Sequence, residues 1–345
     1  MKIDYFETEK AVGKIIFHDI TRIVKGKTKE ARFKKGHRIT AKDVPVLLDM
    51  GKKHIYSIEL EPGDIHEDEA GEKIARLLAG SGLELRGPSE GRINLIAGRR
   101  GLLKIDVPTI DALNRLPDLV VSTFHTNSPV DRGENVVGVK VIPLVVQEES
   151  IHAVEEIVPP GRPAVNVLPY QKINLGVIIT GSEVKEGRIK DGFASVVRGK
   201  TRYYGLEDPP LLYVEDKAEK IAAAIRQLID GGSRLLVVTG GMSVDPDDVT
   251  PAGIRLTGAE TVKYGAPVLP GAMFMLAYRG DIPIIGLPAC ALFYRATVFD
   301  VILPRILAGD RLTAGDISKL GHGGLCRGCS SCRFPHCSFG KGGYC

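Results

Sequence analysis

Three long apolar runs in the second half of the chain, each ending at a loop with glycine, restrict the fold more than any other feature. The runs fall in residues 175–184 (LGVIITGSEV), 234–241 (RLLVVTGG) and 282–290 (IPIIGLPAC), and helical patterns separate them. Strands that are apolar on both faces are typical of a parallel sheet covered by helices. We therefore expect an α/β domain with a three-layer parallel-sheet architecture. Its ligand should bind where the three loops meet, at the carboxyl ends of the strands.

The loop after the second run, within VVTGGMSVDPDDVTPAGI (237–254), contains two adjacent glycines and three aspartates. Gly240 and Gly241 permit a positive φ, so their N–H groups can be directed at an anion such as phosphate. The carboxylates belong to Asp245, Asp247 and Asp248. They would repel a naked phosphate unless a cation such as Mg²⁺ bridges the two. The alternative is that the glycines only turn the chain and the acids stabilise the start of a helix near Thr250.

Three motifs occur together in this half of the chain: TGSEVKEGRIKD (180–191), TGGMSVDPDDVTP (239–251) and GLP (286–288). Through them the region from about 172 to 310 resembles the molybdopterin-binding domain of molybdopterin molybdenumtransferases, molybdopterin adenylyltransferases and the competence-damage protein family. The run PVLPGAMFMLAYRGDIPIIGLP has the order found in the molybdenumtransferase branch. The resemblance implies a molybdopterin-binding α/β domain.

The resemblance also implies which residues form the site. The cofactor-binding residues that it implies are Thr180, Gly181, Ser182, Glu183, Thr239, Gly240, Gly241, Ser243, Asp245, Pro270, Gly271 and Pro288. Thr239, Gly240, Gly241 and Ser243 would cradle the phosphate of the pterin or of a nucleotide. Pro270 with Gly271 would bring a second backbone loop to the site. Asp248 is the candidate catalytic residue, because it would contact a cation or polarise water.

Three positions depart from the family pattern. Ser182 stands in place of an acid, Asp245 in place of a glycine, and Cys290 in place of an amide. Pterin binding should tolerate these changes more easily than hydrolysis or metal insertion. The Cys290 thiol could face molybdenum or its dithiolene, although a small buried hydrophobic residue is the favoured interpretation.

The resemblance leaves two functions open. The first is a molybdenumtransferase-like activity in molybdenum-cofactor biosynthesis, in which Mg²⁺ assists the insertion of molybdate from adenylyl-molybdopterin. The second is a non-catalytic carrier, maturation chaperone or sensor that binds molybdopterin or the finished cofactor. A client molybdoenzyme would be a partner in either case, and the resemblance to transferases suggests a homodimer.

The cysteines concentrate at the end of the chain, where CRGCSSCRFPHC has the spacing C-x2-C-x2-C-x4-C. Thiolates at this spacing can converge on one metal, so we expect Cys326, Cys329, Cys332 and Cys337 to be its ligands. The spacing favours a [4Fe-4S] cluster over Zn²⁺ by a small margin. The alternative is a disordered tail that is rich in thiols.

The first half of the chain mixes helical and strand patterns, and we expect three parts: 1–170, a mixed α+β region; 171–310, the molybdopterin-binding α/β domain; and 311–345, a Cys-rich tail. Residues 93–106 (INLIAGRRGLLKID) predict two strands around a Gly-Arg-Arg-Gly turn. In GDIHEDEAGEKIARLLAGSG we expect a helix that Asp64 caps, with the acids of its first turn on a solvated face.

Charge and hydropathy narrow the classes of partner. The net charge of +4 is too small to indicate nucleic-acid binding, and the residues from Arg311 onward carry the excess. The sequence contains no run of about 18 apolar residues, and MKIDYFETEK is not followed by an apolar segment. We therefore expect a cytoplasmic protein without a membrane segment or a nucleic-acid partner.

Overall fold

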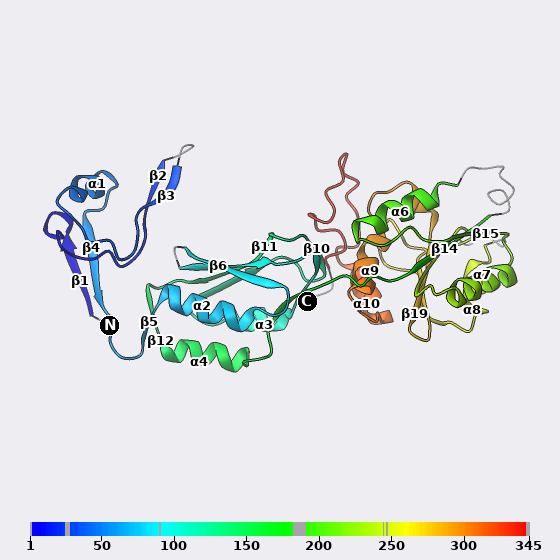
Figure 1. The fold of residues 1–345 in the computed structure, drawn as a ribbon, viewed down its shortest axis with the longest axis horizontal. Coiled ribbons are helices and arrows are strands. Elements are labelled where there is room, and N and C mark those ends of the chain that lie inside the picture. The colour runs from blue at the N-terminus through cyan, green and yellow to red at the C-terminus, as the bar shows by residue number, and fades with distance from the viewer. Residues whose placement is uncertain are drawn as a thin grey trace. The chain divides into compact units, whose positions relative to one another are not determined.

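The computed structural model describes residues 2–24, 28–89, 91–181, 191–243, 245 and 248–342. The chain divides into two compact units, drawn in Figure 1. The first contains Met1–Arg99, Ile105–Phe124 and Arg132–Val167, and the second contains Arg100–Lys104, His125–Asp131 and Leu168–Cys345. Each unit has its own core, and each is described by itself.

The second unit is built on a six-stranded sheet. Its strands, in spatial order, are β15 (Leu211–Val214), β14 (Leu175–Thr180), β16 (Leu235–Thr239), β19 (Ile282–Leu287), β18 (Met275–Arg279) and β17 (Glu260–Tyr264). The three predicted runs form β14, β16 and β19, which pair in parallel as expected. β15 adds a fourth parallel strand, whereas β18 and β17 extend the sheet with antiparallel pairs. The α/β class is confirmed, and the sheet is mixed at one edge.

Helices cover both faces of this sheet, as Figure 1 shows. They are α6 (Phe193–Tyr203), α7 (Ala218–Asp230), α8 (Thr250–Arg255), α9 (Val298–Leu307) and α10 (Ala314–Ser318). Alternate residues of one strand enter opposite cores: Val177 packs in the same cluster as α9, and Ile178 packs in the same cluster as α7. Because successive side chains of a strand point to opposite faces, this alternation produces the three layers.

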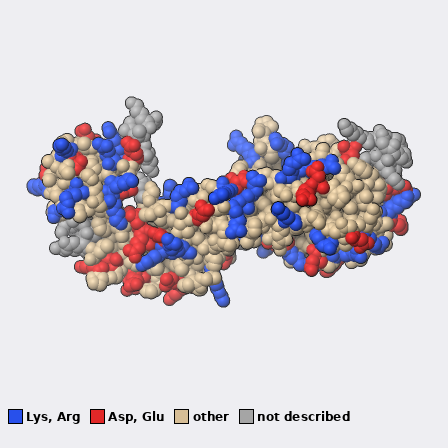
Figure 2. All heavy atoms as spheres, in the orientation of Figure 1, with Lys and Arg blue, Asp and Glu red and all other residues tan. Residues whose placement is uncertain are grey.

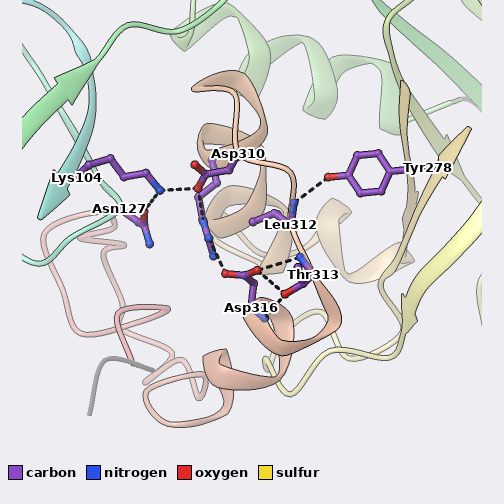
Figure 3. A network of polar contacts seen from close by, with 8 residues as sticks. Lys104, Asn127, Tyr278, Asp310, Leu312, Thr313 and Asp316 are labelled. Carbon is purple, nitrogen blue, oxygen red and sulfur yellow. Dashed lines mark hydrogen bonds and ion pairs between the residues drawn. The ribbon is translucent and has the colours of Figure 1, made fainter. Parts of the chain in front are cut away.

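A network of charged side chains fixes the turn between α9 and α10 (Figure 3). Arg305, on α9, donates to Asp310 and to Asp316, each at 2.9 Å. Lys104 of β8 (Gly101–Ile105) donates to the same Asp310 carboxylate at 2.6 Å. Burial alone would raise the pKa of Asp316, but hydrogen bonds from Thr313 and Arg305 outweigh it and lower the pKa to about 2. β8 pairs with β10 (Ser128–Val130), and this strand pair belongs, except for Ile105, to the second unit.

The first unit contains a four-stranded antiparallel sheet in the order β6 (Leu83–Ser89), β7 (Arg92–Ala97), β11 (Asn135–Val141) and β9 (Leu119–Thr123). The helices of this unit are α1 (Asp43–Asp49), α2 (Glu67–Leu78), α3 (Val107–Leu113) and α4 (Glu148–Ile157). The remaining strands are β1 (Lys2–Glu7), β2 (Ile20–Val24), β3 (Thr28–Phe33), β4 (His54–Glu59), β5 (Asp64–His66), β12 (Val145–Gln147) and β13 (Val165–Leu168).

The start of α2 differs from the prediction. Asp64 lies in β5, and the side chain of His66 caps the helix by accepting from the Asp68 N–H at 3.1 Å. Glu67 is buried rather than solvated, and burial raises its pKa. The prediction that Asp64 caps the helix was wrong, because Asp64 instead pairs with Gln147 where β5 meets β12. Among the helices of the described ranges, none combines the length and apolarity that a membrane crossing requires.

Candidate functional site

A pocket of about 800 Å³ opens at the carboxyl edge of the sheet in the second unit. Four segments line it: residues 240–243 with Asp248, residues 269–273, residues 288–290 with Tyr294, and residues 325–328. The first and third follow β16 and β19 directly. The second precedes β18. Because β18 runs antiparallel to β19, the amino end of β18 lies at the same edge of the sheet as the carboxyl end of β19. The predicted position of the site is therefore where the structure places its largest described pocket.

The Gly240–Gly241 loop has no room for side chains. Both residues have positive φ, and a Cβ on Gly240 would lie 2.4 Å from the carbonyl oxygen of Thr180. The Thr250 hydroxyl donates to the Gly240 carbonyl at 2.9 Å, and the Tyr264 hydroxyl donates to the Met242 carbonyl at 3.1 Å. Hydrogen bonds from two other elements thus hold this loop in one conformation, with its backbone at the pocket.

Gly286 supports the same loop from within the sheet. A Cβ at Gly286 would lie 2.6 Å from Cε of the buried Met242. Because Gly286 on β19 has no side chain, Met242 can pack in the space beside it. The GLP motif of the sequence thus positions the Gly240–Gly241 loop in addition to contributing Pro288 to the pocket.

Asp248 lines the pocket, but part of its carboxylate already has a structural task. Its Oδ2 accepts from the Ser243 N–H at 2.6 Å, and its own N–H donates to the Asp245 carbonyl at 2.9 Å. Asp245 is exposed and is not among the lining residues, and Asp247 lies outside the described residues. Asp248 therefore does not cap α8, as the alternative expected, because its Oδ2 accepts from Ser243 and the N-terminus of α8 has no side-chain cap. Its position at the pocket permits a second contact.

The loop of Pro270 and Gly271 rests on the start of α9. A Cβ on Gly271 would lie 2.6 Å from Cγ1 of Val298, and the Val298 N–H donates to the Pro270 carbonyl at 3.3 Å. Thr297 and Asp300 form a capping box at this helix end. Lys200 binds both oxygens of Asp300 at 2.6 and 2.8 Å. This ion pair fixes the helix end that carries the loop.

Cys290 lies in the short 3₁₀ helix η2 (Ala289–Leu292) and lines the pocket. It is half-buried, so the favoured interpretation of a buried hydrophobic residue is wrong. Burial raises the pKa of the thiol, which keeps it protonated at neutral pH. The sequence could not decide this, because a 3₁₀ turn rather than a strand determines which face of the loop the thiol occupies.

The predicted residues at the ends of β14 and β16 lie behind the pocket. Thr180 and Thr239 are buried, do not line the pocket, and have side-chain hydroxyls with no hydrogen-bond partner among the described residues. The Gly181 N–H donates to the Val214 carbonyl at 3.2 Å and extends the pairing with β15. Ser182 and Glu183 lie outside the described residues.

Asp216 is a site candidate that sequence reasoning missed. It is the second residue after β15, and its Oδ1 lies 3.6 Å from the point that a Cβ on Gly241 would occupy. A carboxylate just after an apolar run, LLYVED, was the available signal. It was missed because β15 is a short edge strand and was not recognised as part of the sheet.

The Cys-rich tail does not form the expected metal site. Cys326 and Cys337 pack against the core, whereas Cys329 and Cys332 are exposed. In the part of the chain that the structure describes, no three His, Cys, Asp or Glu residues are grouped so that they could hold a metal ion. The spacing alone suggested convergence, but packing of the tail on the core separates the thiols. A four-cysteine iron–sulfur or zinc site does not fit this arrangement.

Comparison with known proteins identifies the domain that contains the pocket. Residues 176–308 match the family model described as "Probable molybdopterin binding domain". Residues 5–59 match a second model, described as "Domain of unknown function (DUF8806)". The molybdopterin-binding family thus includes three of the four segments around the pocket, and the segment at 325–328 lies beyond it.

Curated proteins and solved structures match parts of this chain. A molybdopterin molybdenumtransferase of Synechococcus elongatus is 28% identical over 116 residues, which are 31% of this chain and 29% of the relative. A CinA-like protein of Mycobacterium avium is 32% identical over 88 residues, 25% of this chain and 20% of the relative. The chain thus matches less than a third of the length of these curated relatives. The molybdopterin biosynthesis enzyme MoaB of Thermus thermophilus aligns with a TM-score of 0.34 and 19% identity, covering 40% of this chain and 98% of that one.

Proposed function

We propose that the molybdopterin-binding domain binds molybdopterin in the 800 Å³ pocket and serves molybdenum-cofactor biosynthesis. The observation that carries the proposal is the position of this pocket. It lies at the carboxyl edge of the sheet, three of its four lining segments fall within the residues that match the family, and glycine backbone forms part of its wall. Open α/β sheets bind ligands at this edge.

The chain supplies distinct groups for the two ends of such a ligand. The Gly240–Gly241 backbone can offer N–H groups to a phosphate, as glycine loops do elsewhere. The apolar side chains of Leu269, Met273 and Tyr294 suit a flat pterin ring. The buried Thr180 hydroxyl lies next to the glycine loop, 2.6 Å from the point that a Cβ on Gly240 would occupy.

Magnesium fits this site through carboxylates and phosphate together. One or two carboxylates with phosphate oxygens and water satisfy Mg²⁺, so a cluster of three protein ligands is not needed. Asp248 would hold the ion with the oxygen that does not accept from Ser243, and the Asp216 carboxylate lies near Gly241. When bound, the ion would offset the repulsion between the carboxylates and a phosphate.

The finer proposal is a molybdenumtransferase-like step, the insertion of molybdate from adenylyl-molybdopterin. Its support is the name of the Synechococcus elongatus relative and the pocket position of Asp248. The second candidate is a non-catalytic carrier, chaperone or sensor. Two observations favour that role. The Asp248 carboxylate accepts a hydrogen bond from Ser243 within the loop, and Asp245 of the same loop is exposed and does not line the pocket. A client molybdoenzyme and a homodimer stay predictions.

The binding proposal is tested by anaerobic titration with molybdopterin and by iodine oxidation of the purified protein, which turns bound molybdopterin into a fluorescent pterin. Gly240→Ala should weaken binding at least about tenfold, because backbone strain of about 1–3 kcal/mol falls on the loop. Gly199→Ala is the control, because its Cβ would meet open space on α6. Absence of binding by the wild-type chain would reject the proposal.

An assay of adenylyl-molybdopterin conversion distinguishes the transferase-like role from the carrier role. Asp248→Asn keeps an acceptor for the Ser243 N–H but removes the charge. If the wild-type chain converts adenylyl-molybdopterin in the presence of molybdate and Mg²⁺, and Asp248→Asn binds but does not convert it, the transferase-like role is supported. If the wild-type chain binds without any conversion, the carrier role replaces it.

A further inference from the structure

One wall of the pocket comes from outside the molybdopterin-binding domain. The family match ends at residue 308, yet Leu325 to Gly328 line the same pocket as Gly240 and Pro270. The tail therefore gives this chain a part of its ligand site that the matched residues do not encode.

Backbone hydrogen bonds join this segment to the pocket loop. The Leu269 N–H donates to the Gly324 carbonyl, and the Cys326 N–H donates to the Leu269 carbonyl, each at 2.8 Å. These bonds form a parallel bridge between Leu269 and Leu325, beside Pro270. A Cβ on Gly324 would lie 2.4 Å from the Pro267 carbonyl oxygen, so the segment passes closely along the loop. It lies against the pocket as a fixed element rather than a free tail.

The chain is anchored on both sides of the segment. Before it, the Arg305 network holds Asp316 of α10 (Figure 3). After it, Phe339 is buried in the core of the second unit, and the Gly340 N–H donates to the Gly323 carbonyl at 3.0 Å. These contacts hold the tail in position beside the pocket.

The segment brings a cation to the pocket. Among the described residues that line the pocket, Arg327 carries the only cationic side chain, and Asp248 carries the only anionic one. A phosphate in this pocket would meet the repulsion of Asp248, and a guanidinium presents the paired donors that bind phosphate oxygens most effectively. Arg327 is exposed at the pocket, so a ligand can reach it.

We propose that Arg327 binds the phosphate of the pterin, and that the tail thereby makes this site select phosphorylated over dephosphorylated pterins. This inference rests on the proposed function, because it assigns a residue to the ligand proposed above. It adds a specificity-determining residue from a segment that the molybdopterin-binding family model does not include.

The test uses the fluorescent oxidised pterin obtained from molybdopterin, in its phosphorylated and its dephosphorylated form. The wild-type chain should bind the phosphorylated form roughly tenfold more tightly, the range of a charge-assisted hydrogen bond. Arg327→Gln should remove this preference and leave the affinity for the dephosphorylated form unchanged. Arg333→Gln is the matched control, because Arg333 is an exposed tail arginine that does not line the pocket.

Thiol protection provides a second readout that needs no variant. The phosphorylated pterin should slow alkylation of Cys326, which lines the pocket, but not of Cys329. Trypsin separates the two thiols, because cleavage at Lys319, Arg327 and Arg333 places them in LGHGGLCR and GCSSCR. Mass spectrometry of these peptides then measures each rate.

The outcomes are distinct. Equal affinity for both pterins in the wild-type chain, a preference that survives in Arg327→Gln, or equal protection of Cys326 and Cys329 would overturn the inference alone. A wild-type chain that binds neither pterin would overturn the proposed function and the inference with it.

Discussion

At the scale of single residues, close contacts between backbone and side chains decide the shape of the pocket. Gly240, Gly271 and Gly286 each sit where a Cβ would fall within 2.6 Å of another atom. The sequence marked all three as glycines of loops or strand ends. It could not reveal what each one touches, because Thr180, Val298 and Met242 come from other elements.

Gly286→Ala should disturb the pocket without unfolding the domain. The added methyl group meets the flexible end of Met242, so this side chain shifts and the Gly240–Gly241 loop loses its support. We expect a stability loss of about 1 kcal/mol and a fall in molybdopterin affinity of about fivefold. Urea unfolding and anaerobic titration measure the two effects, with Gly199→Ala as the control. An unchanged affinity would show that Met242 does not support the loop.

Removal of Lys200 should be far more costly than removal of an exposed lysine. Its side chain is 14% exposed and that of Asp300 is 12% exposed, so Lys200→Met leaves a buried carboxylate without its partner. We expect a loss of about 3 kcal/mol in the free energy of unfolding. Lys220→Met removes an exposed pair with Glu215 in the same unit and should cost about 0.5 kcal/mol or less. Equal costs for the two variants would contradict this account.

At the scale of elements, strands set the location of the site and short helices hold its loops. The sequence placed β14, β16 and β19 correctly because burial on both faces leaves uninterrupted apolar runs. It missed β15, β17 and β18. β15 and β17 are edge strands and are only partly buried, so they carry no such run. β18 is buried at four of its five positions but runs antiparallel, outside the strand–helix alternation.

α10 should lose its anchor in acid. The pKa of Asp316 is lowered to about 2 from an ordinary value of 3.8, so its contribution is complete above about pH 4 and is lost as the pH falls toward 2. Asp316→Asn should therefore lower stability by about 2 kcal/mol at pH 6, and the difference should shrink at pH 3. Urea unfolding of both proteins at the two pH values measures this. A difference that does not depend on pH would exclude the ionised carboxylate as the cause.

At the scale of the whole molecule, the chain crosses between units more often than the sequence suggested. β7 and β8 flank the Gly-Arg-Arg-Gly turn as predicted, but they do not form a hairpin with each other. β7 belongs to the first unit, and β8 belongs, except for Ile105, to the second. On the face in Figure 2, basic and acidic side chains are interspersed rather than separated into fields of one sign.

A chain that begins at residue 168 should fold less stably than the second unit of the full chain. It would lack Leu102, Leu103 and Val130, which are fully or almost fully buried, and the Lys104 contact with Asp310. We expect a loss of at least about 3 kcal/mol, since each buried aliphatic side chain contributes about 1.5–3 kcal/mol. Urea unfolding of both chains, followed by tyrosine fluorescence, tests this. Equal stability would mean that the strand pair of β8 and β10 adds nothing to the unit.

The sequence by itself determined the α/β class, the parallel core of the sheet and the loops at which the pocket opens. Those features depend on apolar periodicity and on glycine, which are local properties of the chain. Only the tertiary structure decided that Asp216 lies beside Gly241, that Cys290 lines the pocket, and that the tail adds Arg327 to it instead of gathering four thiols. These outcomes depend on packing between segments that lie far apart in sequence. Residue spacing carries no information about such contacts.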